Sequence, residues 1–193
     1  MKLGLVVEGH GEVQSAPILI RRLAESLGLH CTVGFPVRVP RSKITKPREL
    51  ERAVTLLSNK VGDGGAVLVL VDADDDPACT LGPELLRRAQ AARPDRRVGV
   101  VLAVREYEAW FLASAASLRG RRGLPDDLEP PVFAETIRDA KGWLAERMRG
   151  YSPTIDQPAL TAVFDLEQAR SSRSFDKLAR EVVRLLATTT ADR

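Results

Sequence analysis

Carboxylates follow two apolar stretches of this chain at the points where strands should end. Glu8 comes directly after the apolar run 3–7, and Asp72 and Asp74 follow the apolar run 66–71. In an open parallel sheet, functional groups collect beyond the carboxyl ends of the strands, and neighbouring strands lie about 4.8 Å apart. If these runs are neighbouring parallel strands, we expect the three side chains to form one acidic cluster.

A close cluster of carboxylates requires a cation or protons, because like charges repel. Asp72 and Asp74 are separated by one residue, so in an extended stretch both would point to the same side. Carboxylate oxygens suit Mg²⁺ or Mn²⁺, and we therefore predict a divalent-metal site with Glu8, Asp72 and Asp74 as ligands. The alternative is that the acidic run is a solvated turn, as we expect for the two aspartates that follow Asp74.

Two glycines follow Glu8, but their spacing fits neither of the common phosphate-binding loops. The dinucleotide fingerprint G-x-G-x-x-G would need a glycine at Gln14, and the Gly-Lys-Ser/Thr of a Walker A loop does not follow. Gly9 and Gly11 are instead expected to let the chain turn tightly and to keep the approach to Glu8 open. His10, between them, is either a ligand or proton shuttle or an exposed loop histidine.

Apolar runs alternate four times with helical patterns of apolar residues. Nearly continuous apolar runs are typical of strands that are buried on both faces. We therefore predict an α/β fold in which a four-stranded, mainly parallel sheet is flanked by helices on both faces. Pro36 places one of the strands at a sheet edge or a bulge. The predicted strands are 2–7, 31–39, 64–76 and 97–104, and the predicted helices are 13–28, 47–61, 81–92 and 106–118.

The last third of the chain carries no strand signal. Proline and glycine gather at 119–131, which predicts an exposed connection. Helices are expected after it, at 132–149, 158–170 and 174–187. We therefore divide the chain into an α/β domain, 1–118, and a helical C-terminal extension, 119–193, that packs on it to form a single globular unit.

Composition restricts the class of protein. The chain has 193 residues, of which 44% are hydrophobic, and its net charge of +3 is too small to require a nucleic-acid partner by itself. Two cysteines, Cys31 and Cys79, form no zinc or disulfide pattern and suit a reducing cytoplasm. The longest apolar run is too short to span a bilayer, so we predict a cytoplasmic protein with no membrane association.

Two segments are strongly basic. Residues 38–48 carry five basic side chains and no acid, and they follow the second predicted strand on the same side as the acidic cluster. We predict that Arg41, Lys43 and Lys46 from this segment bind nucleic-acid phosphates. Residues 87–97 carry five arginines against one aspartate, but they precede a strand and are expected at the opposite edge, as ordinary solvated surface.

Two motifs, in order along the chain, resemble those of the Toprim domain of topoisomerases, bacterial primases and overcoming-lysogenization-defect (OLD) nucleases. They are the residues E-G-H-G-E at 8–12 after the first strand and D-A-D at 72–74 after a later one. Segments 105–114 and 151–178 further resemble a bacterial Toprim-like domain-of-unknown-function family related to OLD nucleases. With these segments the resemblance spans nearly the whole chain.

The resemblance implies a Toprim-like, Rossmann-like sheet and assigns roles to several acids. Glu8 would be a general acid/base or a metal ligand, and Asp72 and Asp74 would bind Mg²⁺. Glu12 would be a second catalytic acid; its alternative role is to stabilise a helix N-terminus. Glu106 and Glu108 fall where related nucleases place further acids. On the predicted helix they point to different faces, so at most one should join the cluster.

The implied activity is Mg²⁺- or Mn²⁺-dependent phosphoryl transfer, in the first place by a nuclease acting on DNA or RNA. Toprim-like chains of this size often work beside an ATPase subunit, so the resemblance implies a separate ATPase partner and, by analogy, a role in phage defence. The family pattern also favours a lysine near Tyr151, where this chain has Pro153.

Two alternative functions remain open. Pro153 favours a non-catalytic module, in which the acidic pocket binds a metal for regulation or the chain acts as an adaptor for a partner. The same acids could also serve a receiver-like phosphoacceptor. The early position of Glu8 and the absence of a lysine after a final strand count against that third possibility.

Overall fold

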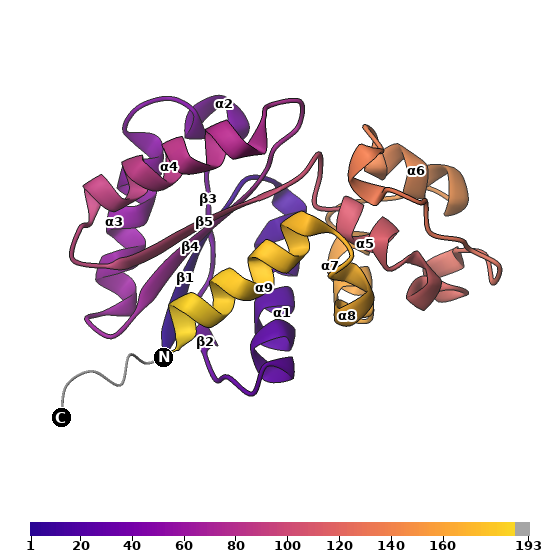
Figure 1. The fold of residues 1–193 in the computed structure, drawn as a ribbon, viewed down its shortest axis with the longest axis horizontal. Coiled ribbons are helices and arrows are strands. Elements are labelled where there is room, and N and C mark those ends of the chain that lie inside the picture. The colour runs from indigo at the N-terminus through magenta and orange to yellow at the C-terminus, as the bar shows by residue number, and fades with distance from the viewer. Residues whose placement is uncertain (188–193) are drawn as a thin grey trace.

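A parallel β-sheet forms the centre of the molecule, as the apolar runs predicted. The computed structural model describes residues 1–187. Its three long strands are β1 (Lys2–Val7), β4 (Ala66–Asp72) and β5 (Arg97–Ala103), and β4 lies between the other two. The other edge of β1 pairs with two short strands, β2 (Thr32–Val33) and β3 (Val37–Arg38), and all these pairs are parallel (Figure 1).

The edge strand is divided by a bulge. Lys2 pairs with Thr32 and Val6 with Val37, so an interval of five residues (32 to 37) faces an interval of four (2 to 6). Pro36, which has no N–H to donate to a sheet, lies in this interval. The strand predicted at 31–39 is therefore two short strands, and the prediction that Pro36 marks an edge or a bulge is confirmed.

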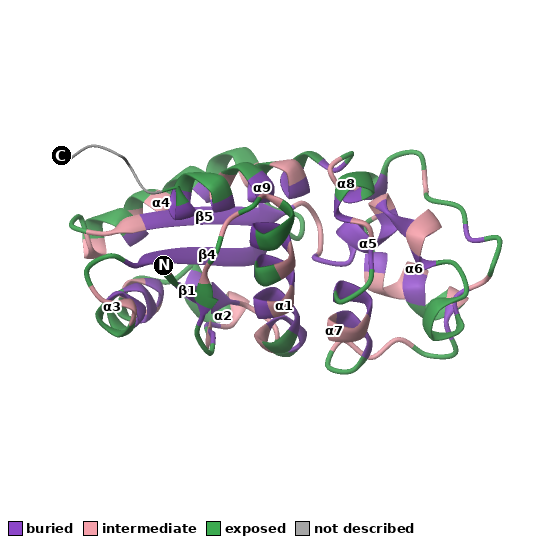
Figure 2. Cartoon of the chain, turned by 90° about the horizontal axis from the view of Figure 1, so that it is seen from below, coloured by how far each residue is buried: buried purple, intermediate pink, exposed green. Residues whose placement is uncertain are grey.

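Helices cover both faces of the sheet (Figure 1). On one face lie α1 (His10–Ser26) and α9 (Arg173–Leu186), and on the other lie α3 (Glu49–Val61) and α4 (Ala78–Ala92). Successive residues of β4 alternate between the two faces: Leu68 joins the hydrophobic cluster of α1 and α9, and Val69 joins that of α3 and α4. All residues of β4 are buried (Figure 2). This arrangement agrees with the predicted α/β class and parallel sheet.

A group of short helices lies beyond one end of the sheet, next to the carboxyl ends of the strands (Figure 1). We call it the helical group. Aromatic side chains pack together in its core: Phe111 packs edge to face with Tyr107 and Phe164, and Trp110 packs on Tyr107 at a tilted angle. Its elements are α5 (Ala109–Ala113), η1 (Ala115–Leu118), η2 (Arg121–Gly123), η3 (Ala134–Thr136), α6 (Ala140–Arg147), α7 (Asp156–Thr161) and α8 (Leu166–Ala169).

Two predicted helices are shorter than expected. The helix predicted at 106–118 begins only at Ala109, because the residues before it form a turn in which Arg105 has a φ of 65°. The helix predicted at 132–149 is reduced to α6. The side chain of Asp139 accepts a hydrogen bond of 2.7 Å from the N–H of Gly142 and so caps the start of α6.

Capping also sets the boundaries of the last helices. The helix predicted at 158–170 is divided into α7 and α8, since Asp165 accepts hydrogen bonds from the first N–H groups of α8. The helix predicted at 174–187 is confirmed as α9, and Ser172 is its N-cap.

The chain after residue 118 contributes to two parts of the molecule. It forms most of the helical group, and α9 then returns to pack against β5 and β4 (Figure 1). The last residues of the predicted extension, 188–193, lie outside the described part of the chain. Within residues 1–187, no helix is long and apolar enough to cross a membrane.

Candidate active site

The carboxylate of Asp72 lies at the carboxyl end of β4, at the centre of the candidate site. Asp72 is 8% exposed, and its Oδ1 accepts a hydrogen bond of 2.8 Å from the backbone N–H of Tyr107. Its Oδ2 lies 3.7 Å from Nζ of Lys141. Asp72 is therefore held between the turn that follows β5 and the start of α6.

Lys141, near the start of α6, brings three carboxylates together. Besides its contact with Asp72, its Nζ lies 2.9 Å from Glu106 Oε1 and 3.3 Å from Glu108 Oε2. Its backbone N–H donates another hydrogen bond, of 3.0 Å, to Glu106 Oε2. The prediction that at most one of these glutamates joins the cluster is wrong. The helix begins after them, at Ala109, so the turn presents both to the lysine.

Glu108 is fully buried and is held by two neutral donors. Its Oε1 accepts hydrogen bonds of 2.8 Å from the hydroxyl of Tyr151 and 3.0 Å from Nε2 of Gln157. The same amide nitrogen lies 3.4 Å from Oε1 of Glu12, so Gln157 links two acids of the site. Glu108 Oε2 forms the ion pair with Lys141 but makes no hydrogen bond within residues 1–187.

Glu12 has the helix-stabilising role that was its alternative interpretation. Its Oε2 accepts a hydrogen bond from the backbone N–H of Gly9, at the start of α1. Glu12 is nevertheless buried among the acids of the site.

Close packing, and not a left-handed backbone conformation, favours glycine before and after His10. Gly9 has a φ of −94°, which any residue can adopt. A Cβ at Gly9 would lie 2.7 Å from the Glu12 carboxylate, and one at Gly11 would lie 2.7 Å from the carbonyl oxygen of Pro153.

Arg41, in the short helix α2 (Arg41–Ile44), lies on the other side of the strand ends. Its guanidinium donates hydrogen bonds of 2.9 and 3.2 Å to the carbonyl oxygens of Asp72 and Ala73, and it pairs with the Asp76 carboxylate. It lies 4.0 Å from Glu8 Oε2 and 3.6 Å from Asp74 Oδ2. The basic segment 38–48 is therefore next to the acidic cluster, as predicted.

The two aspartates predicted to point the same way do not do so. Asp74 has a φ of 50°, so the alternation of an extended strand ends before it. Asp72 contacts Lys141, whereas the half-exposed Asp74 contacts Arg41. The structure thus brings Glu8 and Asp72 together with Glu12, Glu106 and Glu108, and it places Asp74 at the rim.

The remaining predicted residues lie at the surface. Lys43 and Lys46 are exposed on and just after α2, and His10 is exposed at the start of α1. Three of the five arginines of 87–97, Arg88, Arg93 and Arg96, form ion pairs; Arg88, for example, pairs with Glu51 at 2.7 Å. Much of that second basic segment is therefore occupied by local contacts, and the role of Lys43 and Lys46 as phosphate contacts stays a prediction.

Burial changes the proton affinity of Glu8. Removal from water raises the pKa of Glu8 to about 7; the neighbouring carboxylates of Asp74 and Glu12 act in the same direction, and Arg41 opposes them. A carboxyl group with this pKa exchanges its proton near neutral pH, which is the property required of a general acid or base.

Asp72, Glu108 and Lys141 affect one another's protonation. Burial raises the pKa of Asp72 well above its usual range, and the charges of Glu12 and Glu108 add to this. Burial also raises the pKa of Glu108, with Lys141 opposing. Burial alone would lower the pKa of Lys141, but Glu108, Asp72 and Glu106 together raise it above its usual value, so its ammonium stays charged. The cluster therefore combines a permanent cation with acids that hold protons readily.

The Glu8→Gln variant is expected to be more stable than the wild type above neutral pH in metal-free buffer. The folded pKa of about 7 exceeds the ordinary value of 4.5, so the folded protein binds more protons between them and its stability falls as pH rises through this range. Glutamine cannot ionise and escapes this loss, which amounts to about 1–3 kcal/mol for a mostly buried carboxyl group. Urea denaturation at about pH 5 and pH 8 measures it.

A suitable control is Glu49→Gln, which removes an exposed glutamate from α3. It should leave the pH dependence of the unfolding free energy unchanged. If Glu8→Gln and the wild type lose stability equally between the two pH values, the raised pKa of Glu8 is disproved.

The donor chemistry of the cluster fits a hard divalent cation, since every acidic ligand atom is a carboxylate oxygen. Buried oxygens of Glu8 and Glu108 have no hydrogen-bond partner in the described part of the chain. Within residues 1–187, however, no three His, Cys, Asp or Glu side chains stand ready to hold a metal ion. The ammonium of Lys141 lies among the oxygens of Asp72, Glu106 and Glu108 instead.

Sequence reasoning missed three residues of the site: Lys141, Tyr151 and Gln157. The resemblance implied a lysine near Tyr151; the lysine that the structure places among the acids is Lys141, on α6. One signal was available, because the chain has only six lysines against 23 arginines and Lys141 is the only lysine between Lys60 and Lys177. Where arginine is used so generally, a single lysine over so long a stretch is informative.

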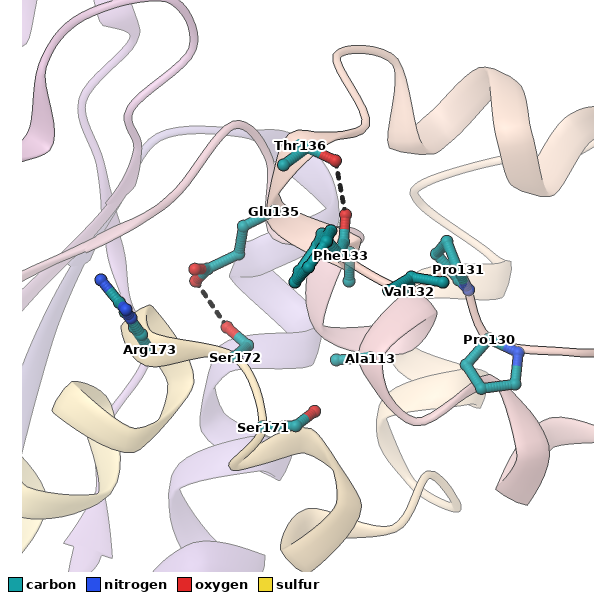
Figure 3. A pocket seen from close by; sticks show the side chains of 11 residues that line it. Ala113, Pro130, Pro131, Val132, Phe133, Glu135, Thr136, Ser171, Ser172 and Arg173 are labelled. Atoms are coloured by element: carbon teal, nitrogen blue, oxygen red, sulfur yellow. Dashed lines mark hydrogen bonds between the residues drawn. The ribbon is translucent and has the colours of Figure 1, made fainter.

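A cavity of about 660 Å³ lies between η3 and the start of α9 (Figure 3). Glu135 spans its inner side and accepts hydrogen bonds of 2.6 Å from Ser172 Oγ and 2.8 Å from the N–H of Ser174. Phe133 and Val132 line it and are exposed. The described lining includes none of the acids that surround Lys141, so this cavity is separate from the candidate active site.

Comparison with known proteins identifies the family of this chain. Searches of curated proteins and of solved structures found no significant match. The model of one family, described as a domain of unknown function (DUF4276), matches residues 7–182, a range that contains every residue of the candidate site. The chain therefore belongs to the DUF4276 family.

Proposed function

We propose that this protein is a divalent-metal-dependent phosphoryl-transfer enzyme of the Toprim type, and specifically a nuclease that acts on DNA or RNA. One observation carries the proposal: carboxylates at the end of β4 and in the turn after β5 lie together around one ammonium group, and Glu8, directly after β1, lies near them. Burial of ionisable groups costs stability, and a cluster of them with shifted pKa values is typical of a functional site.

A metal bound by Asp72, Glu106 and Glu108 would supply Lewis-acid activation of a phosphodiester and of a water molecule. Glu8, with its pKa of about 7, accepts or donates a proton at neutral pH. Lys141 offers its ammonium to the charge that develops on the phosphate. Tyr151 and Gln157 hold the Glu108 carboxylate in place.

The predicted phosphate contacts have different tasks in this proposal. Arg41 holds the loop after β4 through two carbonyl oxygens, so its main effect is to position Asp74 and to offset the charge of Glu8. Lys43 and Lys46 are exposed and free to contact the nucleic-acid backbone away from the reacting phosphate.

The resemblance of 8–12 and 72–74 to Toprim motifs also supports a wider role. By analogy with OLD nucleases, we propose a separate ATPase subunit as partner and a role in phage defence in the cytoplasm. The large helical group beyond the strand ends offers surface for such a partner (Figure 1).

A second candidate function is a non-catalytic regulatory or adaptor module. The observation that favours it is the internal neutralisation of the acids: Lys141 and Arg41 already pair with carboxylates on both sides of the strand ends. In such a module the cluster would hold the helical group against the sheet, and no metal would be needed.

A cleavage assay tests the nuclease proposal. Purified protein is incubated with plasmid, single-stranded DNA and tRNA in the presence of Mn²⁺ or Mg²⁺, and a parallel sample contains EDTA. We expect metal-dependent cleavage of at least one substrate by the wild type and none by an Asp72→Ala, Asp74→Ala double variant. Asp95→Ala, which removes an exposed acid near the start of β5, is the matched control and should cleave normally.

Equal cleavage by the wild type and the double variant would show that another protein or another site is responsible. If the wild type cleaves none of the substrates and also binds no Mn²⁺ in isothermal titration calorimetry, the adaptor function is favoured.

A further inference from the structure

Lys141 is attached to the acidic cluster in two different ways. Its backbone N–H bonds Glu106 Oε2 at 3.0 Å, which fixes the start of α6 to the turn after β5. Its Nζ independently reaches Glu106 Oε1, Glu108 Oε2 and Asp72 Oδ2, at 2.9, 3.3 and 3.7 Å. The side chain can therefore leave the carboxylates while α6 stays in place.

The carboxylate oxygens around Nζ cannot serve the ammonium and a divalent cation together. A Mg²⁺ ion takes its oxygen ligands at about 2.1 Å, so an ion among these oxygens would lie within a few ångströms of Nζ. Repulsion between a doubly charged ion and an ammonium at such a distance is strong even in water. One of the two cations must therefore give way.

Lys141 is the cation that can move. Its side chain is 35% exposed and has a flexible four-carbon stem, so the ammonium has a path to solvent. Arg41 differs, because its guanidinium is bonded to the carbonyl oxygens of Asp72 and Ala73. Glu108 Oε2 is buried and lies 3.3 Å from Nζ but makes no hydrogen bond in the described chain, so the ammonium satisfies this ring of acids incompletely.

We propose that Lys141 and a divalent cation compete for the carboxylates of Asp72, Glu106 and Glu108, so that metal binding releases the ammonium toward solvent. The inference rests on the proposed function, since it takes these acids to be the metal site. In this inference the ammonium occupies the acids while metal is absent and is freed when a metal binds.

Chemical labelling of the wild-type protein tests the release directly. Reductive methylation with formaldehyde, followed by mass spectrometry, measures the reactivity of each lysine with and without saturating Mg²⁺. We expect methylation of Lys141 to become faster by about tenfold or more with Mg²⁺, because the ammonium leaves its ion pairs. Lys177, an exposed lysine of α9, should react at the same rate in both samples and serves as the internal control.

The affinity for metal gives a second measurement. In Lys141→Met the ammonium is removed while the aliphatic stem is kept, so the variant should bind Mn²⁺ about tenfold more tightly or better. Lys177→Met makes the same charge change away from the cluster and should bind as the wild type does. Mn²⁺ binding is followed by electron paramagnetic resonance of the free ion, and circular dichroism verifies that each variant is folded.

The outcomes separate this inference from the proposed function. If the wild type binds Mn²⁺ but Lys141 reactivity is unchanged at saturation, competition is disproved and the metal site stands. If the folded Lys141→Met variant binds Mn²⁺ no better than the wild type, the same conclusion follows. If neither protein binds Mn²⁺ and Mg²⁺ does not alter Lys141 reactivity, both the inference and the metal-dependent function fail.

Discussion

Asp72→Asn is expected to lower the rate of metal-dependent cleavage by about a thousandfold or more, because it removes a ligand from the centre of the proposed site. Asp74→Asn should cost only about ten- to a hundredfold, the size of effect typical of a residue outside the ligand shell. Asp72 is buried beside Lys141, whereas Asp74 is 52% exposed and turned toward Arg41. The structure thus assigns very different weights to two aspartates that look equivalent in sequence.

Initial rates at saturating Mn²⁺ measure this difference, with thermal unfolding as the check on folding. Asparagine can still accept the hydrogen bond from the Tyr107 N–H through its side-chain oxygen, so Asp72→Asn should remain folded. Equal losses in the two variants would contradict the separation of Asp72 from Asp74, and an active Asp72→Asn would contradict the role of Asp72 itself.

Trp110→Ala is expected to destabilise the fold by about 3–5 kcal/mol, the usual cost of removing a fully buried aromatic side chain. Trp110 packs against Tyr107 and Phe175, with ring centroids 4.9 and 5.4 Å apart, and its Nε1 donates a hydrogen bond of 2.8 Å to Ser174 Oγ. Ser174 in turn accepts the N–H of Val104 at 3.3 Å. The tryptophan therefore also supports the turn that carries Glu106 and Glu108.

Urea denaturation measures the change, and Trp143→Ala is the matched control. Trp143 is only partly buried, with the Arg147 guanidinium 4.0 Å from its ring centroid, so its removal should cost clearly less. A Trp110→Ala variant within about 1 kcal/mol of the wild type, the average effect of a substitution, would show that this aromatic core is not essential to the fold.

Local sequence patterns were sufficient to predict the strands of the sheet, but they did not predict the turns around the candidate site. The strands β1, β4 and β5 were predictable because a strand buried on both faces must be apolar at every position. The start of the helix predicted at 106–118 was placed too early, because the apolar spacing of this helix extends into the turn before it. In that turn Arg105 adopts a positive φ. The helix at 132–149 was overextended because the choice of Asp139 as N-cap depends on its neighbours in space as well as on its type.

The sequence by itself determined the α/β class, the parallel strands and the place where acids collect. These follow from the apolar periodicity and from the rule that parallel strands end at one edge. Glu8 and Asp72 could be placed in this way because each directly follows a strand.

Only the tertiary structure decided which side chains the acids meet. Lys141, Tyr151 and Gln157 reach the site from α6, from the chain before α7 and from α7, far along the chain from the strands that carry the acids. Contacts between such distant segments leave no periodicity in the sequence. Only the packing of the helical group against the strand ends places Lys141 among the acids and brings Gln157 to Glu12.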